Sequence, residues 1–103
     1  MDMKPEHHRI LCDILATHLP GREVRLFGSR ATGTAKPHSD IDLVIMGDEP
    51  LLVTTMRILH DAFDDCDLPF QVDLVEWAGT SAEFKKVIEK TAVSLKNPQG
   101  YAA

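Results

Sequence analysis

Residues 28–43 read GSRATGTAKPHSDIDL, and this stretch decides how the rest of the chain is interpreted. At its end, the DIDLVIM pattern of residues 40–46 is typical of a buried strand. At its start, Gly28 and Ser29 break the alternating EVRLF strand pattern of residues 23–27. Between the two strands we expect a short helical turn and then a polar loop. Because this connection is too tight for a crossover, the two strands are predicted to be antiparallel.

The patterns outside this stretch predict one more strand and three longer helices. Apolar residues at i, i+4 spacing indicate helices over residues 4–19 and 51–63, and a third that follows the segment at residues 80–83 and runs to about Leu95. The run FQVDLVEW, residues 70–77, is typical of a strand. Because a helix separates it from the preceding strand, these two strands are predicted to be parallel. The expected fold class is α/β (α+β), a small mixed β-sheet of about three strands flanked by helices.

Two details of the helices follow from the same patterns. The segment TSAE at residues 80–83 is typical of a capping box, in which Glu83 would close back on the Thr80 amide. The core face of the last helix would consist of Phe84, Val87, Ile88 and Leu95. The core face of the preceding helix would consist of Leu52, Met56, Leu59 and Phe63.

Length and composition indicate one compact domain. The chain has 103 residues, of which 44% are hydrophobic and 26% are charged, as in an ordinary soluble globular protein. We expect a single domain over residues 1–96 and a flexible tail over residues 97–103. The 11 Lys and Arg residues against 16 Asp and Glu residues give a net charge of −5, which argues against direct nucleic-acid binding.

The cysteines and the apolar runs bear on the compartment. Cys12 and Cys66 form no CxxC pair and indicate no disulfide framework, which favours the reducing cytoplasm. No apolar run approaches the roughly 20 residues of a membrane-spanning helix. The N-terminus lacks the apolar core of a signal peptide. We therefore expect a cytoplasmic protein that does not bind a membrane.

Asp40 and Asp42 are the strongest chemical feature of the sequence. Two residues apart on a strand, their side chains point to the same face, whereas Ile41 points to the other face, toward a core. Carboxylates held this close repel each other unless a cation lies between them. Oxygen ligands favour Mg²⁺ or Mn²⁺ over zinc. The pair predicts a divalent metal site, and the alternative is two solvated acids at the start of a strand.

A third carboxylate would complete a site for two metal ions, and residues 70–77 offer two candidates. Asp73 and Glu76 face opposite sides of that strand. The neighbours of Asp73 are apolar, and a charge inside an apolar strand is costly unless something pairs with it. If the second and third strands are neighbours, Asp73 meets the Asp pair. We therefore prefer Asp73 and interpret Glu76 as a solvated residue at the rim.

Gly28 and Ser29 are candidates for phosphate binding. Glycine lets a phosphate approach the backbone, and the free amides of a helix start can donate to an anion together with the Ser29 hydroxyl. Taken alone, a Gly-Ser turn is more simply a helix cap. Arg30 and Lys36 are candidates for contacts with phosphate oxygens, although either also suits a solvated surface position.

The combination is much more specific than its parts. The Gly-Ser pair, the Asp-x-Asp pair after ten intervening residues and Asp73 on a later strand occur together over nearly the whole chain. The sequence resembles the DNA polymerase β nucleotidyltransferase superfamily and, within it, the minimal nucleotidyltransferases. One departure is Thr32, where many relatives have a second arginine, which affects a phosphate contact but not the metal site. The resemblance implies a polymerase β palm-like nucleotidyltransferase fold.

The resemblance also implies a role for each residue of the pattern. Gly28 and Ser29 would hold the triphosphate of the nucleotide, with ATP as the substrate. Asp40 and Asp42 would bind both metal ions, two Mg²⁺ with Mn²⁺ as an alternative. Asp73 would bind the second ion and orient or deprotonate the attacking hydroxyl. Two ions would then stabilise the entering and leaving oxygens as pyrophosphate departs.

Family resemblance finally implies a partner. Minimal nucleotidyltransferases are commonly paired with a small helical HEPN-type protein, and the nucleotidyltransferase acts as an antitoxin by adenylylating a tyrosine of this toxin. Two alternatives stay open. One is a non-catalytic antitoxin that neutralises its partner by occlusion, and the other is a nucleotidyltransferase that acts on a small-molecule hydroxyl. The complete set of three aspartates favours an active enzyme.

Overall fold

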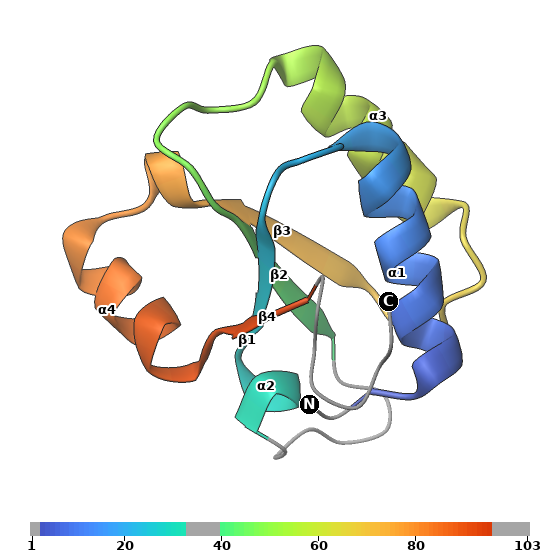
Figure 1. Ribbon diagram of the computed structural model, residues 1–103, viewed down its shortest axis with the longest axis horizontal. Coiled ribbons are helices and arrows are strands. Elements are labelled where there is room, and N and C mark those ends of the chain that lie inside the picture. Colours follow the sequence, from blue (N-terminus) through green and yellow to red (C-terminus); the bar gives the residue numbers. More distant parts are fainter. Residues whose placement is uncertain (1–2, 33–39, 96–103) are drawn as a thin grey trace.

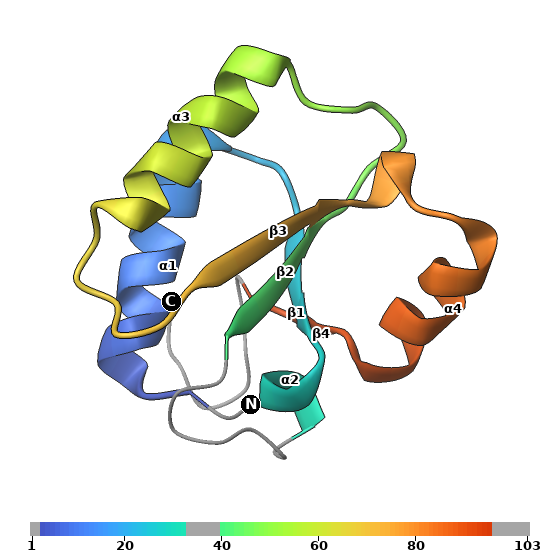
Figure 2. The ribbon, with the colours of Figure 1, turned by 180° about the vertical axis from the view of Figure 1, so that it is seen from behind.

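The computed structural model describes residues 3–32 and 40–95, so the expected tail at residues 97–103 lies outside it. The described residues form one mixed sheet, with α1 and α3 side by side on one face and α4 on the other (Figures 1 and 2). None of the helices in these ranges combines the length and apolar character that a bilayer crossing requires. In chain order the elements are α1 (Pro5–His18), β1 (Val24–Phe27), α2 (Ser29–Thr32), β2 (Ile41–Ile45), α3 (Val53–Asp64), β3 (Val72–Glu76), the 3-10 helix η1 (Trp77–Gly79), α4 (Ala82–Thr91) and β4 (Val93–Ser94).

Within the described part of the chain, the sheet has four strands in the order β3-β2-β1-β4. β1 is antiparallel to β2, with Leu26 opposite Leu43, and β2 is parallel to β3, with Leu43 beside Leu74. Both predicted orientations and the predicted fold class are confirmed. The expected number of about three strands is too low, because it misses β4, a short edge strand antiparallel to β1.

The alternation along β2 divides its side chains between two cores. Leu43 and the isoleucines two residues to either side are fully buried in the larger core, between the sheet and helices α1 and α3. Val44 points to the other face and packs with Ile88 of α4 in a smaller core. Since side chains alternate along a strand, Asp42 lies on the α4 face. Both faces of β2 therefore pack in a core, and only the start of the α4 face is left to polar residues.

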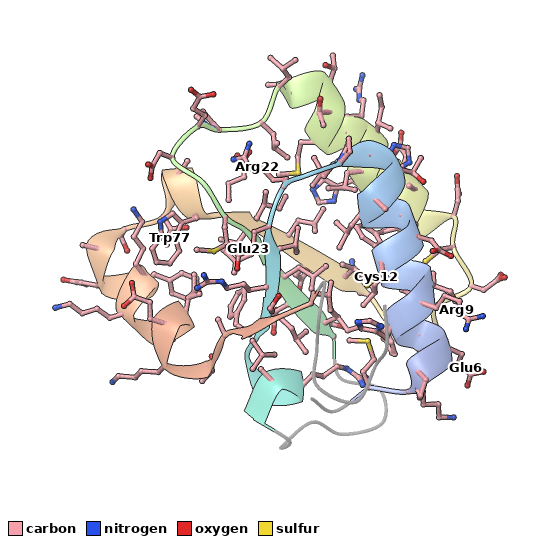
Figure 3. The ribbon with its side chains drawn as sticks, viewed as in Figure 1. Glu6, Arg9, Cys12, Arg22, Glu23 and Trp77 are labelled. Carbon is pink, nitrogen blue, oxygen red and sulfur yellow. The ribbon has the colours of Figure 1, made fainter. Side chains whose placement is uncertain are left out.

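Aromatic side chains attach α4 to the sheet. Trp77 is the first residue of η1, and the ammonium of Lys85 on α4 is 4.9 Å from the centroid of its ring (Figure 3). Phe84 of α4 meets Phe27 of β1 edge-on, with 6.0 Å between the ring centroids. These contacts supplement the small apolar area that α4 buries.

The last helix ends earlier than predicted. α4 ends at Thr91, not at Leu95, because Ala92 is extended (φ −65°, ψ 135°) and turns the chain back along β1. The Leu95 amide donates to the Val24 carbonyl at 3.1 Å. Leu95 is buried as expected, but directly after the edge strand and not within a helix. Ile88 and Leu95 are also spaced like residues on one helix face, and for that reason the pattern missed the strand.

The start of α4 also differs from the prediction. Ser81 is the N-cap residue, and its hydroxyl accepts a hydrogen bond from the Phe84 amide at 3.2 Å. The Thr80 amide donates to the Trp77 carbonyl at 3.1 Å, and this ends η1. The predicted capping box is therefore wrong by one position, because the turn of η1 uses the Thr80 amide.

Three residues predicted to lie on core faces are exposed. Leu52 is 73% exposed because it is the N-cap of α3 and lies outside the helical face. Phe84 and Val87 are 38% and 53% exposed, because Ile88 is the one position of α4 that is fully covered by the sheet. α4 thus buries only Ile88 fully, and on the sheet face that it covers Asp40 and Asp73 are exposed.

The assigned core can be tested with two leucines. Leu43→Ala should lower the free energy of unfolding by about 2–5 kcal/mol, the usual cost of a cavity at a fully buried site. Leu52→Ala removes the same atoms from an exposed position and should change it by less than about 0.5 kcal/mol. Chemical denaturation measures both variants, and equal losses would contradict the assignment of Leu43 to the core.

Candidate active site

Three aspartates lie on the α4 face of the sheet, where β2 and β3 begin. Asp42 is in register with Asp73 on the parallel neighbour strand, and residues paired in this way point to the same face. Asp40 directly precedes β2, and it is close enough to Asp42 for its negative charge to act on that carboxylate. Asp40 and Asp73 are exposed, and Asp42 is half-buried. The structure therefore places the three carboxylates that the sequence singles out at one end of one face.

The ionised form of the Asp42 carboxylate is disfavoured by its surroundings. Burial raises the pKa of Asp42 above its ordinary value, and the negative charges of Asp73 and Asp40 raise it further. The ionised form of Asp42 is thus destabilised in the folded chain. A bound cation would remove this repulsion.

Gly28 lies directly against the Asp42 carboxylate. β1 ends at Phe27, which is opposite Asp42, so the residue that follows passes beside the carboxylate. Gly28 has a φ of +78°, and a Cβ added to it would be 2.6 Å from Asp42 Oδ2. Glycine is the residue that suits both the backbone conformation and the space. The contact between Gly28 and Asp42 therefore brings the Gly-Ser pair next to the Asp-x-Asp pair.

The residue after Gly28, Ser29, begins α2, which is a single helical turn. Arg30 is 6% exposed, and its guanidinium carbon lies 4.3 Å from the centroid of the Phe70 ring. The His7 ring meets the same phenyl ring edge-on, with 5.2 Å between centroids. A buried and stacked guanidinium is not a solvated surface cation, so that alternative for Arg30 is wrong. Lys36 lies outside the described residues.

Glu76, the alternative third carboxylate, lies on the opposite face of the sheet. It is in register with Ile45, a residue of the larger core. Its Oε1 accepts a hydrogen bond from the Leu51 amide at 2.7 Å, just before α3. Glu76 is therefore a half-buried anchor for the start of α3, and its interpretation as a solvated rim residue is wrong. Asp73 is the carboxylate on the same face as Asp42.

The donor set suits a hard divalent cation by its chemistry. Carboxylates are the oxygen ligands that Mg²⁺ prefers, and positive charge relieves their repulsion. In residues 3–32 and 40–95, no three His, Cys, Asp or Glu side chains are already grouped as they would be around an ion. Two of the three carboxylates are exposed, so they can change rotamer without repacking the core. The residues that would hold a metal are Asp40, Asp42 and Asp73.

Comparison with known proteins identifies the family. The family model described as "Nucleotidyltransferase domain" matches residues 8–95. The chain belongs to the nucleotidyltransferase family. A Haemophilus influenzae member of the family, named probable protein adenylyltransferase MntA, is 40% identical over 99 residues, which are 96% of this chain and 87% of that protein. The resemblance inferred from the motif is confirmed.

Chains of solved toxin–antitoxin complexes share the fold. A toxin–antitoxin complex with AMP-PNP contains a chain with a TM-score of 0.72 and 24% identity, covering 89% of this chain and 74% of that one. A Shewanella oneidensis complex of a tri-AMPylated HEPN toxin with an MNT antitoxin has a TM-score of 0.66 and 20% identity, covering 90% and 71%. At these identities the likeness establishes the fold, and the expected nucleotidyltransferase fold is confirmed.

Thr91 contacts Gly28, although no sequence pattern marks it as a site residue. The Thr91 hydroxyl accepts a hydrogen bond from the Gly28 amide at 3.4 Å. In a helix that continued to Leu95, Thr91 would have no reason to face the end of β1. Its position depends on the early end of α4, which no local sequence signal marks.

The close approach of Gly28 to Asp42 can be tested against a matched glycine. Gly21 has the same φ of +78°, but nothing lies within 4 Å of an added Cβ. Gly21→Ala should therefore cost only the strain of a left-handed backbone, about 1–2 kcal/mol. Gly28→Ala should lower the free energy of unfolding by more, because its Cβ also collides with the Asp42 carboxylate. Equal losses in chemical denaturation would contradict the contact.

Removing the charge of Asp42 should stabilise the metal-free chain. Near neutral pH we expect Asp42→Asn to raise the midpoint of thermal unfolding by about 2–6 °C, because the repulsion disappears. The raised pKa sets the sign of the pH dependence. Protonated Asp42 is favoured in the folded chain, so wild-type stability is lost as the pH rises through the folded pKa, and the advantage of the variant appears over the same range.

Mg²⁺ should reverse the order of the unfolding midpoints of the wild type and Asp42→Asn. Adding Mg²⁺ should raise the unfolding midpoint of the wild type, since an ion that binds the folded state stabilises it, and should have little effect on Asp42→Asn. Asp67→Asn, an exposed acid in the turn before β3, should respond like the wild type. The same Mg²⁺ response in all three proteins would contradict the proposed metal ligands.

Proposed function

We propose that the chain is a Mg²⁺-dependent protein adenylyltransferase that transfers AMP from ATP to a hydroxyl of a HEPN-type toxin, and so acts as its antitoxin. The observation that carries the proposal is the in-register pair of Asp42 and Asp73, with Gly28 against Asp42. Membership of the nucleotidyltransferase family supports the reaction class. The relative at 40% identity, a probable protein adenylyltransferase, supports AMP as the group and a protein as the acceptor.

Gly28 and Ser29 are the proposed contacts of the triphosphate. Gly28 has no side chain to keep a phosphate from the backbone, and α2 begins at the next residue. Arg30 and Lys36 are the proposed additional contacts of the phosphate oxygens. The stacking of Arg30 on Phe70 favours a role in holding α2 in place.

Asp40, Asp42 and Asp73 are the proposed catalytic carboxylates and metal ligands. Two bound Mg²⁺ ions, or Mn²⁺, would supply the positive charge that the phosphates and the developing oxyanions require. Asp73, exposed at the start of β3, would orient the acceptor hydroxyl and take its proton. The new bond joins the acceptor oxygen to the α-phosphorus of ATP, and the bond to the β-phosphate breaks. Pyrophosphate is the leaving group.

A toxin as partner is supported by the solved relatives. They are complexes of a toxin with an antitoxin, one of them with AMP-PNP and another with an AMPylated HEPN toxin. Asp40 and Asp73 are exposed, so a hydroxyl of a second folded protein, for which we expect a tyrosine, has access to them. Both cysteines are free, which suits the cytoplasm as the compartment of the reaction.

The activity can be tested by mass spectrometry. The chain is incubated with Mg²⁺, labelled ATP and a purified HEPN-type toxin, and the toxin is then weighed intact. We expect its mass to increase by one or more AMP groups. Asp42→Asn and Asp73→Asn should lower the rate by at least about 100-fold, because each removes a carboxylate at the reacting centre.

Control variants separate catalysis from binding. Asp67→Asn should transfer AMP like the wild type, and the two active-site variants should still bind the toxin. An unchanged toxin mass with Mg²⁺ or Mn²⁺ and every common nucleoside triphosphate would overturn the proposal. Neutralisation of the toxin by Asp42→Asn as efficiently as by the wild type would instead establish occlusion as the mechanism.

A further inference from the structure

Thr91, the last residue of α4, lies next to Gly28, the residue between β1 and α2. β4 pairs antiparallel with β1, with Leu26 opposite Val93. The same register, carried two residues further, places Gly28 opposite Thr91. Both residues lie just outside the strands, Gly28 after the end of β1 and Thr91 as the last residue of α4. The contact between them is therefore a product of the sheet register and not of a flexible surface.

The contact replaces a backbone hydrogen bond of the ladder. In an antiparallel pair, hydrogen-bonded positions recur at every second residue. The Leu95 amide bonds to the Val24 carbonyl, so the recurring positions are Val24, Leu26 and then Gly28 on this side. Thr91 is still helical and does not extend the strand. Its hydroxyl accepts from the Gly28 amide at 3.4 Å in place of a backbone carbonyl.

Gly28 needs such support because it carries two constraints at once. It is the residue that must approach the Asp42 carboxylate, and its φ of +78° opens α2 directly after the strand. Glycine also has the greatest backbone freedom of any residue, so its conformation must be imposed by its neighbours. The Thr91 hydroxyl supplies a fixed partner, because Thr91 belongs to a helix that is anchored by β4 on its C-terminal side.

We propose that Thr91 is a positioning residue for nucleotide binding. Its hydroxyl holds the Gly28 amide, and thereby keeps Gly28 and Ser29, the proposed contacts of the triphosphate, beside Asp42. This inference rests on the proposed function, because that function assigns the loop to ATP. Thr91 acts on the nucleotide through Gly28. Through this hydrogen bond, Thr91 connects α4 and the edge strand β4 to Gly28.

The test compares Thr91→Val, which keeps the shape but lacks the hydroxyl, with Thr91→Ser, which keeps the hydroxyl. We expect Thr91→Val to weaken binding of AMP-PNP with Mg²⁺ by about 3- to 10-fold in calorimetry, the effect of one hydrogen bond. The KM for ATP should rise by a similar factor, with a smaller change in kcat. Thr91→Ser should bind the nucleotide like the wild type.

A matched control removes a threonine hydroxyl elsewhere. Thr17 on α1 donates to the Asp13 carbonyl at 2.8 Å, and Thr17→Val should leave nucleotide affinity unchanged. The proposal is overturned if Thr91→Val lowers the unfolding midpoint but binds AMP-PNP like the wild type, or if Thr91→Ser is as impaired as Thr91→Val. Calorimetry does not depend on an acceptor. A wild type that binds AMP-PNP without modifying the toxin would therefore refute the proposed function alone, and absent binding would refute both.

Discussion

The parallel pairing of β2 with β3 is the constraint on which the site depends. It sets Asp42 beside Asp73, and a slip of one residue would turn one of the two carboxylates to the opposite face. The register is secured from that opposite face, where Leu43 lies beside Leu74 against helices α1 and α3. Apolar packing on one side of the sheet thus determines the polar geometry on the other, and the site needs no long loop to bring its acids together.

This geometry costs the protein stability in the absence of ligands. The raised pKa of Asp42 reflects a carboxylate that is partly buried beside two like charges, and Gly28 packs against it at a left-handed φ. Neither feature benefits the fold. Both suit the proposed site, in which negative charges would be concentrated before a cation and a nucleotide bind. The compact cores on the two faces of the sheet offset this cost.

The sequence was sufficient to predict the features that depend on strand periodicity. The alternation in IDLVI and VDLVE places Asp42 and Asp73 on the face opposite the larger core. It also places Glu76 on the other face from Asp73, without any tertiary information. It was not sufficient where distant residues decide the outcome. Arg30 is buried because Phe70 lies over its guanidinium, and the helical spacing of Leu95 concealed β4 until its pairing with β1 was known.

The small extent of α4 bears on which kind of acceptor can reach the carboxylates. It covers the carboxylate face through Ile88, while Phe84 and Val87 remain exposed. A larger cover would bury Asp73, raise the energy of its ionised form and exclude any hydroxyl carried on a folded protein. A thin helix that is fixed by its cap at Ser81 and by β4 after its end can define the site and leave it open. The exposure of Asp40 and Asp73 beside α4 is therefore the structural property that most favours a protein as the acceptor.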